Sequence, residues 1–383
     1  MKIRAAVLDR MGVAPPYATS KPLAIRTVEL DPPGPDEVLI KVAAAGLCHS
    51  DLSVINGDRP RPVPMALGHE ASGIVEAVGA GVGDLKPGDH VVAVFVPSCG
   101  HCVPCAEGRP ALCEPGAAAN GAGTLLSGAR RIHHDHAGHG DADVPALNHH
   151  LGCSVFAEYA VLSRRSLVRI DPAVPLDEAA LFGCAVLTGV GAVVNTAQVR
   201  AGASTAIIGL GGVGLAALIG ARAAGAATIV AIDLSPAKLD EARALGATHV
   251  FDARDPETRD RVRAATGGGV DYAFEFAGAV RALDLAYAIT RRGGTTVTAG
   301  LPPAAASFGS PAVSQVAEER TLKGSYIGPC VPSRDIPRFM DLYRQGRLPV
   351  DRLLSGRLAL DDINLGFDLL HEGRAVRQVV VFD

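Results

Sequence analysis

The stretch STAIIGLGGVG, residues Ser204–Gly214, decides the fold of this 383-residue chain. Its apolar run leads into the glycine turn Gly209-x-Gly211-x-x-Gly214, which opens the helical pattern LAALIGARAAGA. Asp233 ends the next apolar run, ATIVAID. Glycines alone are weak evidence, but a strand, a glycine turn, a helix and a second strand that ends on an acidic residue form the context of a dinucleotide-binding fingerprint.

The turn therefore predicts a coenzyme site. Gly209 permits the tight turn, Gly211 lets the backbone approach a pyrophosphate, and Gly214 lets the helix pack against the strand. Phosphate groups would lie at the N-terminus of the helix, where backbone N–H groups point outward. The residues expected at this turn are Gly209, Gly211, Gly212, Val213 and Gly214.

Asp233 predicts the type of coenzyme. A carboxylate at this place binds the ribose 2′-hydroxyl and repels a 2′-phosphate, which favours NAD over NADP. The alternative is a helix cap, for which Ser235 is the better candidate. Lys238, five residues on, can reach the adenosine ribose or lie on a solvated helix face.

The rest of the chain divides around this motif. Up to about residue 180, short β-rich runs such as EVLIKVAAAG and AEYAVLS alternate with Pro/Gly turns. From about Ala203, strands alternate with helices, which predicts a doubly wound parallel sheet. The expected layout is an α/β domain over residues 186–327, inserted in a β-rich domain formed by residues 1–185 and 328–383.

Composition restricts the class of protein. Hydrophobic residues make up 48% and charged residues 20% of the chain, a globular balance. A net charge of −4 gives no reason to expect nucleic acid or an anionic membrane as partner. The start, MKIRAAVLDRMG, lacks the apolar core of a signal peptide, and the eight cysteines are clustered like metal ligands, so we expect a cytoplasmic location.

Cys99, Cys102, Cys105 and Cys113 form the pattern C-x2-C-x2-C-x7-C. Four thiolates this close suit a tetrahedral zinc ion, and because protein would fill all four positions, the site would be structural. A disulfide-stapled loop is the alternative, which the expected compartment disfavours.

Three further motifs complete a family resemblance. GLCHSD with Cys48, GHE with His69, the four-cysteine loop, GCAVLTGVGA with Cys184, and GLGGVG follow one another over nearly the whole chain. This order resembles the zinc-containing medium-chain dehydrogenase/reductases, specifically the alcohol dehydrogenases related to the liver and class III (glutathione-dependent formaldehyde dehydrogenase) enzymes. The resemblance implies a GroES-like catalytic domain around a Rossmann domain, with the active site in the cleft between them.

The resemblance also implies the catalytic residues. Cys48, His69 and Cys184 would bind a catalytic zinc with an open fourth position, the ligand set of this family. Asp51 would orient His69, and Glu70 would approach the zinc during ligand exchange. Zinc would lower the pKa of a bound alcohol, whose alkoxide gives hydride to NAD, while Ser50 relays the proton. Thr188 and Arg377 are assigned to the coenzyme site. Two zinc ions per subunit are expected.

The chain departs from the family pattern at two places. Ser53 stands where liver-type enzymes carry the histidine that ends the proton relay, so the end of the relay is open. His49 either takes part in the relay or only contacts the coenzyme. No arginine follows Cys113 to hold a glutathione carboxylate, with Arg59 or the insert as the alternative anchor.

Six of the twelve histidines lie between Arg130 and His150. We expect a mobile surface loop there, with a further metal site as the alternative.

The resemblance assigns a substrate pocket to Phe95, His150, Leu151, Leu301 and Tyr326, for which plain core packing is the alternative. His149 adjoins this pocket. Cys153 and Cys330 are unassigned thiols.

The length of the chain and its insert resemble the dimeric branch of the family. A homodimer is therefore expected, with a tetramer as the alternative.

The function predicted from these features is an NAD-dependent zinc alcohol dehydrogenase that interconverts primary or aromatic alcohols and aldehydes. A class III enzyme that oxidises the formaldehyde–thiol adduct is the close alternative. A non-catalytic protein that senses NAD or metal is the third hypothesis, against which the set of Cys48, His69, Cys184 and Ser50 argues.

Overall fold

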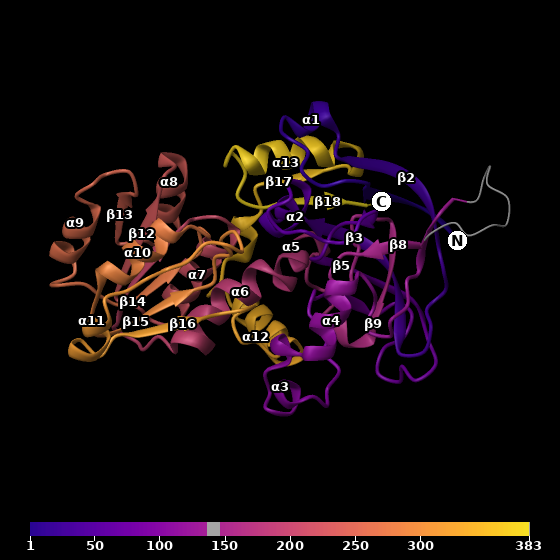
Figure 1. Cartoon of the computed structure of the whole chain (residues 1–383). Coiled ribbons are helices and arrows are strands. Elements are labelled where there is room, and N and C mark those ends of the chain that lie inside the picture. The colour runs from indigo at the N-terminus through magenta and orange to yellow at the C-terminus, as the bar shows by residue number, and fades with distance from the viewer. Residues whose placement is uncertain (136–145, 383) are drawn as a thin grey trace. The chain divides into compact units, whose positions relative to one another are not determined.

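The computed structural model, drawn in Figure 1, describes residues 1–135 and 146–382. Its contacts divide the chain into two compact units. The first unit comprises Met1–Cys184, Val331–Pro337 and Leu354–Asp383, and the second comprises Ala185–Cys330 and Arg338–Leu353.

These units differ from the predicted domains at Ala185, at residues 328–330 and in one longer segment. The predicted layout assigns Arg338–Leu353 to the β-rich domain, whereas its contacts lie with the second unit. There Val350 and Leu353 are buried, and the Arg352 guanidinium donates a hydrogen bond to the Ala244 carbonyl at 3.0 Å. The domain boundaries at residues 185/186 and 327/328 stay predictions.

The second unit is built on a six-stranded parallel sheet (Figure 1). Its spatial order is β13-β12-β11-β14-β15-β16, which in chain order reads 3-2-1-4-5-6, the order of the doubly wound dinucleotide-binding fold. The predicted Rossmann sheet is thereby confirmed. Its strands are β11 (Ser204–Ile208), β12 (Thr228–Asp233), β13 (His249–Asp252), β14 (Val270–Glu275), β15 (Thr290–Thr298) and β16 (Thr321–Gly324).

Helices cover both faces of this sheet because alternate side chains of a strand point to opposite faces. From β11, Ala206 and Ile208 join a core that includes Val262 and Ile289. Ile207 points the other way, toward the helix that carries Gly214. The helices are α7 (Gly212–Ala223), α8 (Pro236–Leu245), α9 (Thr258–Ala265) and α10 (Val280–Ile289).

The glycine turn between β11 and α7 is determined by two close approaches. Gly209 has φ +88°, and a Cβ atom on it would lie 2.7 Å from the Ala277 nitrogen. A Cβ atom on Gly214 would lie 1.8 Å from the Gly209 carbonyl oxygen. Gly211 differs, since a Cβ atom there meets nothing within 4 Å. The fold therefore needs the first and third glycines, whereas the second leaves open space at the start of α7.

The first unit contains a closed barrel and a seven-stranded sheet. The barrel, in the order β1-β2-β7-β8-β4, encloses Ile3, Val28, Ile132 and Leu147. Its strands are β1 (Lys2–Leu8), β2 (Leu23–Leu30), β4 (Met65–Ala66), β7 (Ile132–His134) and β8 (Ala146–His149). The sheet has β3 (Glu37–Gly46), β5 (Ala71–Val78), β6 (His90–Ala93), β9 (Tyr159–Ser163), β10 (Leu167–Arg169), β17 (Gly356–Leu358) and β18 (Gln378–Val381).

Short helices connect these sheets. The α-helices are α1 (Tyr17–Ser20), α2 (His49–Ile55), α3 (Val103–Ala106), α4 (Glu114–Ala122), α5 (Leu176–Ala179), α6 (Ala185–Gly191), α11 (Ala312–Ala317), α12 (Pro332–Arg344) and α13 (Ile363–His371). A π-helix spans Ala192–Ala197. Five 3-10 helices span Pro110–Leu112, Arg164–Ser166, Ala180–Gly183, Val350–Leu353 and Leu360–Asp362. Among residues 1–135 and 146–382, no single helix is long and apolar enough to cross a membrane, although the bent pair Leu176–Gly183 and Ala185–Ala197 meets the length and composition criteria jointly.

We expect Gly214→Ala to lower the free energy of unfolding by about 1–3 kcal/mol, because the new methyl group would overlap the Gly209 carbonyl and force the turn to move. Gly211→Ala is the matched control and should change it by less than about 0.5 kcal/mol. Urea denaturation of both variants measures the difference. Equal stabilities would show that the turn adapts to the methyl group.

Candidate active site and metal centres

The predicted catalytic ligands converge in the first unit. One ligand atom from each of Cys48, His69, Glu70 and Cys184 can be chosen so that all four lie within 4.8 Å of one another, and all four residues are buried. Cys48 precedes α2, His69 follows β4, and Cys184 follows a 3-10 helix, so the group joins three separate segments. Such a set of sulfur, nitrogen and oxygen donors suits zinc.

Glycines let these segments approach so closely. A Cβ atom on Gly68 would lie 2.4 Å from the Phe156 nitrogen, and one on Gly183 would lie 2.3 Å from the Ala93 carbonyl oxygen. A Cβ atom on Gly46 would lie 2.0 Å from a Glu70 carboxylate oxygen. Each glycine stands one or two residues before a ligand, and a side chain there would displace the ligand.

Asp51 fixes the orientation of His69. Its Oδ1 atom lies 2.9 Å from Nδ1 of His69, and both side chains are fully buried. Because a carboxylate only accepts hydrogen bonds, His69 donates its Nδ1 proton, which leaves the lone pair on Nε2. That buried Nε2 atom accepts no hydrogen bond from any residue within 1–135 and 146–382. An imidazole lone pair left open beside two thiols suits a metal cation.

The ligand thiols are polarised by their neighbours. The Cys184 side chain, together with the charges of Arg377 and His69, holds the pKa of Cys48 well below its usual range. Burial raises the pKa of Glu70 to about 7, although the Arg377 charge opposes it. A lowered pKa favours the thiolate, the form in which cysteine binds metal.

Arg377, predicted in the coenzyme site, lies beside this group. Its Nη1 atom donates hydrogen bonds of 2.9 Å to Glu70 Oε1 and to the Leu47 carbonyl. Arg377 is 3% exposed and Glu70 is 0% exposed. A buried ion pair of this kind holds the carboxylate in place next to the ligands. The coenzyme role of Arg377 stays a prediction.

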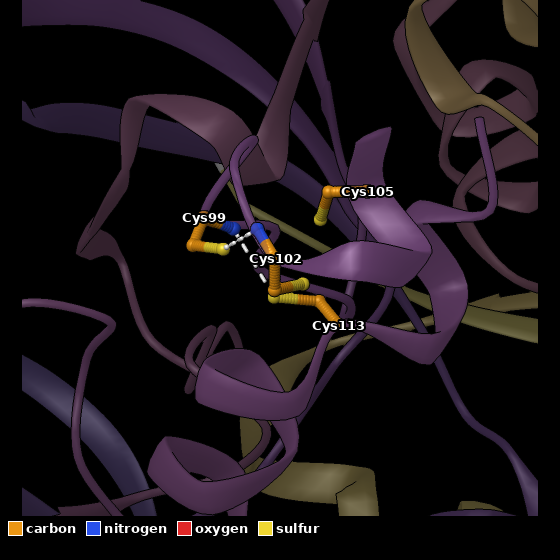
Figure 2. A group of neighbouring side chains, drawn as sticks. All are labelled: Cys99, Cys102, Cys105 and Cys113. Carbon is orange, nitrogen blue, oxygen red and sulfur yellow. Dashed lines mark hydrogen bonds between the residues drawn. The ribbon is translucent and has the colours of Figure 1, made fainter. Parts of the chain in front are cut away.

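The four-cysteine loop brings its sulfur atoms together, as Figure 2 shows. The sulfur atoms lie within 4.8 Å of one another, and none is in a disulfide. Backbone N–H groups of Cys99 and Gly116 donate to the Cys113 sulfur at 3.1 and 3.3 Å. Backbone donors from His101 and Cys102 lower the pKa of Cys99 to about 6. Four free thiols with N–H donors around them fit a zinc ion better than the disulfide alternative.

The glycine turn is tied to Asp233 in the second unit. The Asp233 carboxylate accepts hydrogen bonds from the backbone N–H of Leu210 at 2.7 Å and of Ser235 at 2.9 Å. Ser235 occupies the N-cap position of α8, although its side chain makes no capping hydrogen bond there with a described residue. Lys238 on α8 and Thr188 on α6 are partly exposed. The open space at Gly211, at the first turn of α7, fits a phosphate group.

The residues of the predicted proton relay lie at the start of α2. His49 is exposed and Ser50 is partly exposed. The Ser53 hydroxyl donates to the His49 backbone carbonyl at 2.8 Å, so its hydrogen is already engaged.

The predicted pocket residues have different surroundings in the two units. Phe95, His150 and Leu151 of the first unit are 8%, 1% and 7% exposed. The rings of Phe95 and His150 each meet the His69 ring edge to face, with centroids 5.2 and 5.5 Å apart. Leu301 and Tyr326 of the second unit are 52% and 41% exposed.

The histidine-rich segment is described only in part. The mobile loop predicted for residues 130–150 is wrong at both ends, where Ile132–His134 forms β7 and Ala146–His149 forms β8. Residues 136–145, with His136 and His139, lie outside the described residues. His133 lies 2.8 Å from the Asp31 carboxylate. Cys153 and Cys330 are buried cysteines outside any disulfide, and the Cys330 sulfur donates to the Leu187 carbonyl at 3.4 Å.

Two family models match the chain. The alcohol dehydrogenase GroES-like domain matches residues 34–172, and the zinc-binding dehydrogenase model matches residues 212–345. The alcohol dehydrogenase class-3 of Myxine glutinosa is 39% identical over 95% of this chain and 96% of its own length. The S-(hydroxymethyl)glutathione dehydrogenase of Paracoccus denitrificans is 36% identical over the full length of both chains.

Solved structures agree with these matches. An alcohol dehydrogenase zinc-binding domain protein from Burkholderia ambifaria has a TM-score of 0.92 at 35% identity, over 100% of this chain and 99% of its own. The benzyl alcohol dehydrogenase of Acinetobacter calcoaceticus has a TM-score of 0.91 at 31% identity, over 100% of both chains. The family implies NAD and zinc as cofactors, which the open glycine turn and the two donor groups fit. The chain is an enzyme that belongs to the zinc-containing alcohol dehydrogenases of the medium-chain dehydrogenase/reductase family.

Proposed function

We propose that this enzyme interconverts primary or aromatic alcohols and their aldehydes with NAD. The observation that carries the proposal is the buried convergence of Cys48, His69 and Cys184 within 4.8 Å. Two thiolates and one imidazole leave a fourth tetrahedral position for substrate, as a catalytic zinc site requires. The aromatic preference is supported by the likeness to a structure named benzyl alcohol dehydrogenase.

In this proposal, Cys48, His69 and Cys184 hold the catalytic zinc. When bound, zinc supplies a Lewis acid for the alcohol oxygen and NAD supplies the hydride acceptor. Asp51 keeps the His69 proton on Nδ1, since its carboxylate lies 2.9 Å away. Glu70, held by Arg377 at 2.9 Å, is a spare carboxylate for ligand exchange.

Ser50 is proposed to take the proton of the alcohol hydroxyl. It stands in the first turn of α2, two residues after the ligand Cys48. His49 is exposed at the start of the same helix and is the candidate for the next step or for a coenzyme contact. Ser53 does not serve as the relay end here, because its hydroxyl donates to a backbone carbonyl.

The coenzyme is proposed to bind at the glycine turn, with its pyrophosphate at Gly211. Asp233 would accept the ribose hydroxyls and exclude a 2′-phosphate by charge. Lys238, Thr188 and Arg377 are the further contacts that we propose. The four-cysteine loop would hold a second, structural zinc, because protein sulfur atoms supply all four ligands.

The substrate pocket is proposed to include Phe95, His150, Leu151, Leu301 and Tyr326. Phe95 and His150 support this role, since their rings flank the ligand His69. Ser50, smaller than a threonine, leaves room for larger alcohols.

A class III activity toward the formaldehyde–thiol adduct is the second candidate. The relatives named class-3 alcohol dehydrogenase and S-(hydroxymethyl)glutathione dehydrogenase favour it. Helix α4, which follows Cys113, has the sequence EPGAAANGA and offers no cation for a glutathione carboxylate. We therefore rank it second.

We further propose a cytoplasmic homodimer, with a tetramer as the alternative. None of the eight cysteines, all of which the structure describes, is in a disulfide, which suits a reducing compartment. Strand β16 forms an edge of the sheet with all four residues exposed, and Val313 and Val316 of α11 are 74% and 82% exposed. An open edge with apolar neighbours is a common subunit contact.

Rates of NADH formation over a panel of aliphatic and aromatic alcohols test the substrate class. We expect turnover of primary and benzylic alcohols without added thiol. Formaldehyde is included with and without glutathione. Activity confined to formaldehyde plus a thiol would replace the first candidate by the second, and no activity with any substrate would contradict both.

The two metal sites predict reciprocal losses. Cys184→Ala should lose one zinc and roughly a thousandfold or more of turnover, because Lewis-acid stabilisation is worth several kcal/mol, while NADH binding persists. Cys102→Ala should lose the other zinc and lower Tm by roughly 5 °C or more. Atomic absorption, NADH fluorescence titration and calorimetry measure these changes. A fully active Cys184→Ala variant would disprove the catalytic assignment.

Asp233→Gly should raise kcat/KM with NADP relative to NAD by about tenfold or more, because the charge that repels a 2′-phosphate is removed. Asp233→Asn is the matched control: it removes the charge but keeps one oxygen that can accept from Leu210 or Ser235, so NADP use should rise with a smaller loss of stability than in Asp233→Gly. Steady-state kinetics with both coenzymes measure the ratio. An unchanged ratio in both variants would mean that another residue discriminates.

A further inference from the structure

The His150 imidazole shares one carboxylate oxygen with the metal-ligand candidate His69. Asp51 Oδ1 lies 2.9 Å from His69 Nδ1 and 3.2 Å from His150 Nδ1. The side chains of Asp51 and His69 are 0% exposed, and that of His150 is 2% exposed. The other Asp51 oxygen accepts from the Cys48 backbone N–H at 3.2 Å. One carboxylate therefore connects both metal-ligand segments to His150.

The backbone holds His150 firmly in this place. Its N–H donates to the Ser154 hydroxyl at 2.9 Å, and its carbonyl accepts from the Cys153 N–H at 2.9 Å. The Ser154 hydroxyl in turn donates to the Ala66 carbonyl at 2.8 Å, three residues before His69. The turn that carries His150 is thus bonded to the segment that carries His69.

The contact with Asp51 determines the tautomer of His150. Its Nδ1 atom makes no aligned hydrogen bond with any residue that the structure describes, so the Asp51 oxygen at 3.2 Å is its polar neighbour. A lone pair on Nδ1 would face the carboxylate oxygen and be repelled, whereas an N–H group is attracted. We therefore place the His150 proton on Nδ1.

A buried carboxylate needs such donors. Desolvation of an ionised group is costly unless hydrogen-bond donors or positive charges surround it. Asp51 accepts hydrogen bonds from the Cys48 N–H and the His69 N–H, and the His150 N–H, whose nitrogen lies 3.2 Å away, adds a favourable electrostatic contact. Removing one donor leaves Asp51 less well compensated and freer to turn away from His69.

We propose that His150 is a positioning residue for the catalytic metal: it acts through Asp51 to hold His69 in its ligand orientation and so sets how tightly the Cys48–His69–Cys184 site retains zinc. The inference rests on the proposed function of that site. It adds to His150 a role beyond lining the substrate pocket.

A separate metal on Asp51, His69 and His150 is the competing explanation, since donor atoms of these residues also lie within 4.8 Å of one another. The 2.9 Å contact argues against it, because the Nδ1 atom of His69 that faces Asp51 carries a proton and has no lone pair to offer.

The test compares zinc release from the purified full-length holoenzyme to a chromogenic chelator. His150→Phe keeps an aromatic ring but loses the N–H, and we expect it to release one zinc about tenfold faster, as loss of an outer partner of a metal ligand typically does. His150→Asn, whose amide can restore the donor at the Nδ1 position, should return to near the wild-type rate. Cobalt absorption spectra of the substituted enzymes provide a second readout.

His149→Phe is the matched control. It removes the neighbouring buried imidazole, whose Nε2 accepts from the Arg131 N–H at 3.0 Å, and it should release zinc at the wild-type rate. Thermal unfolding of every variant separates metal loss from misfolding.

The outcomes distinguish this inference from the proposed function. The inference is overturned if His150→Phe releases zinc at the wild-type rate. It is also overturned if His150→Asn and His149→Phe both release zinc as fast as His150→Phe does. If the wild-type enzyme binds a third metal ion that only the His150 variants lose, the positioning role is replaced by a separate metal site on Asp51, His69 and His150. If Cys184→Ala retains both zinc ions, the catalytic site itself is wrongly assigned.

Discussion

The first unit depends on the charge balance of one buried group. Cys48, Glu70 and Cys184 bring negative or ionisable donors together, and Arg377 is the cation that faces Glu70 at 2.9 Å. Burying such donors without compensation costs several kcal/mol per charge, so the arrangement is stable only with a cation among them. A divalent metal supplies that charge and also occupies the unpartnered lone pair of His69.

The backbone at the start of α2 fits this need for charge balance around the ligands. Asp51 stands at the third position of α2 and accepts from the Cys48 N–H at the helix start, which closes a capping box around a ligand. The same carboxylate reaches His69. Asp51 therefore caps the start of α2, orients the ligand His69 and adds a charge that the group has to balance. A substitution at Asp51 would affect all three. The glycines before the ligands serve the same end, since each removes a side chain where two segments touch.

The parts that could be predicted from sequence are those encoded over short distances. Ser204–Gly214 and Asp233 predicted the parallel sheet because strand, turn, helix and acidic residue follow one another within one βαβ unit. Strand β3 was predicted with its observed bounds, Glu37–Gly46. Strand β2 and helix α9 were missed, since α9 buries only Thr258 and Val262 and β2 interrupts its apolar residues with charges. The pairing of Arg377 with Glu70 joins residues 307 positions apart, and no local pattern encodes it.

His149 and His150 mark the limit of such prediction, because they are the same letter in neighbouring positions. His149 is the last residue of β8 and His150 begins the turn that follows it, and the two imidazoles enter different surroundings. Burial, with the charges of Arg130 and Arg131, lowers the pKa of His149 to about 3, and its Nε2 accepts a backbone hydrogen bond. His150 instead meets the Asp51 carboxylate at 3.2 Å. One histidine is a neutral structural acceptor and the other faces the metal-site carboxylate, because the chain leaves β8 after His149 and turns at His150.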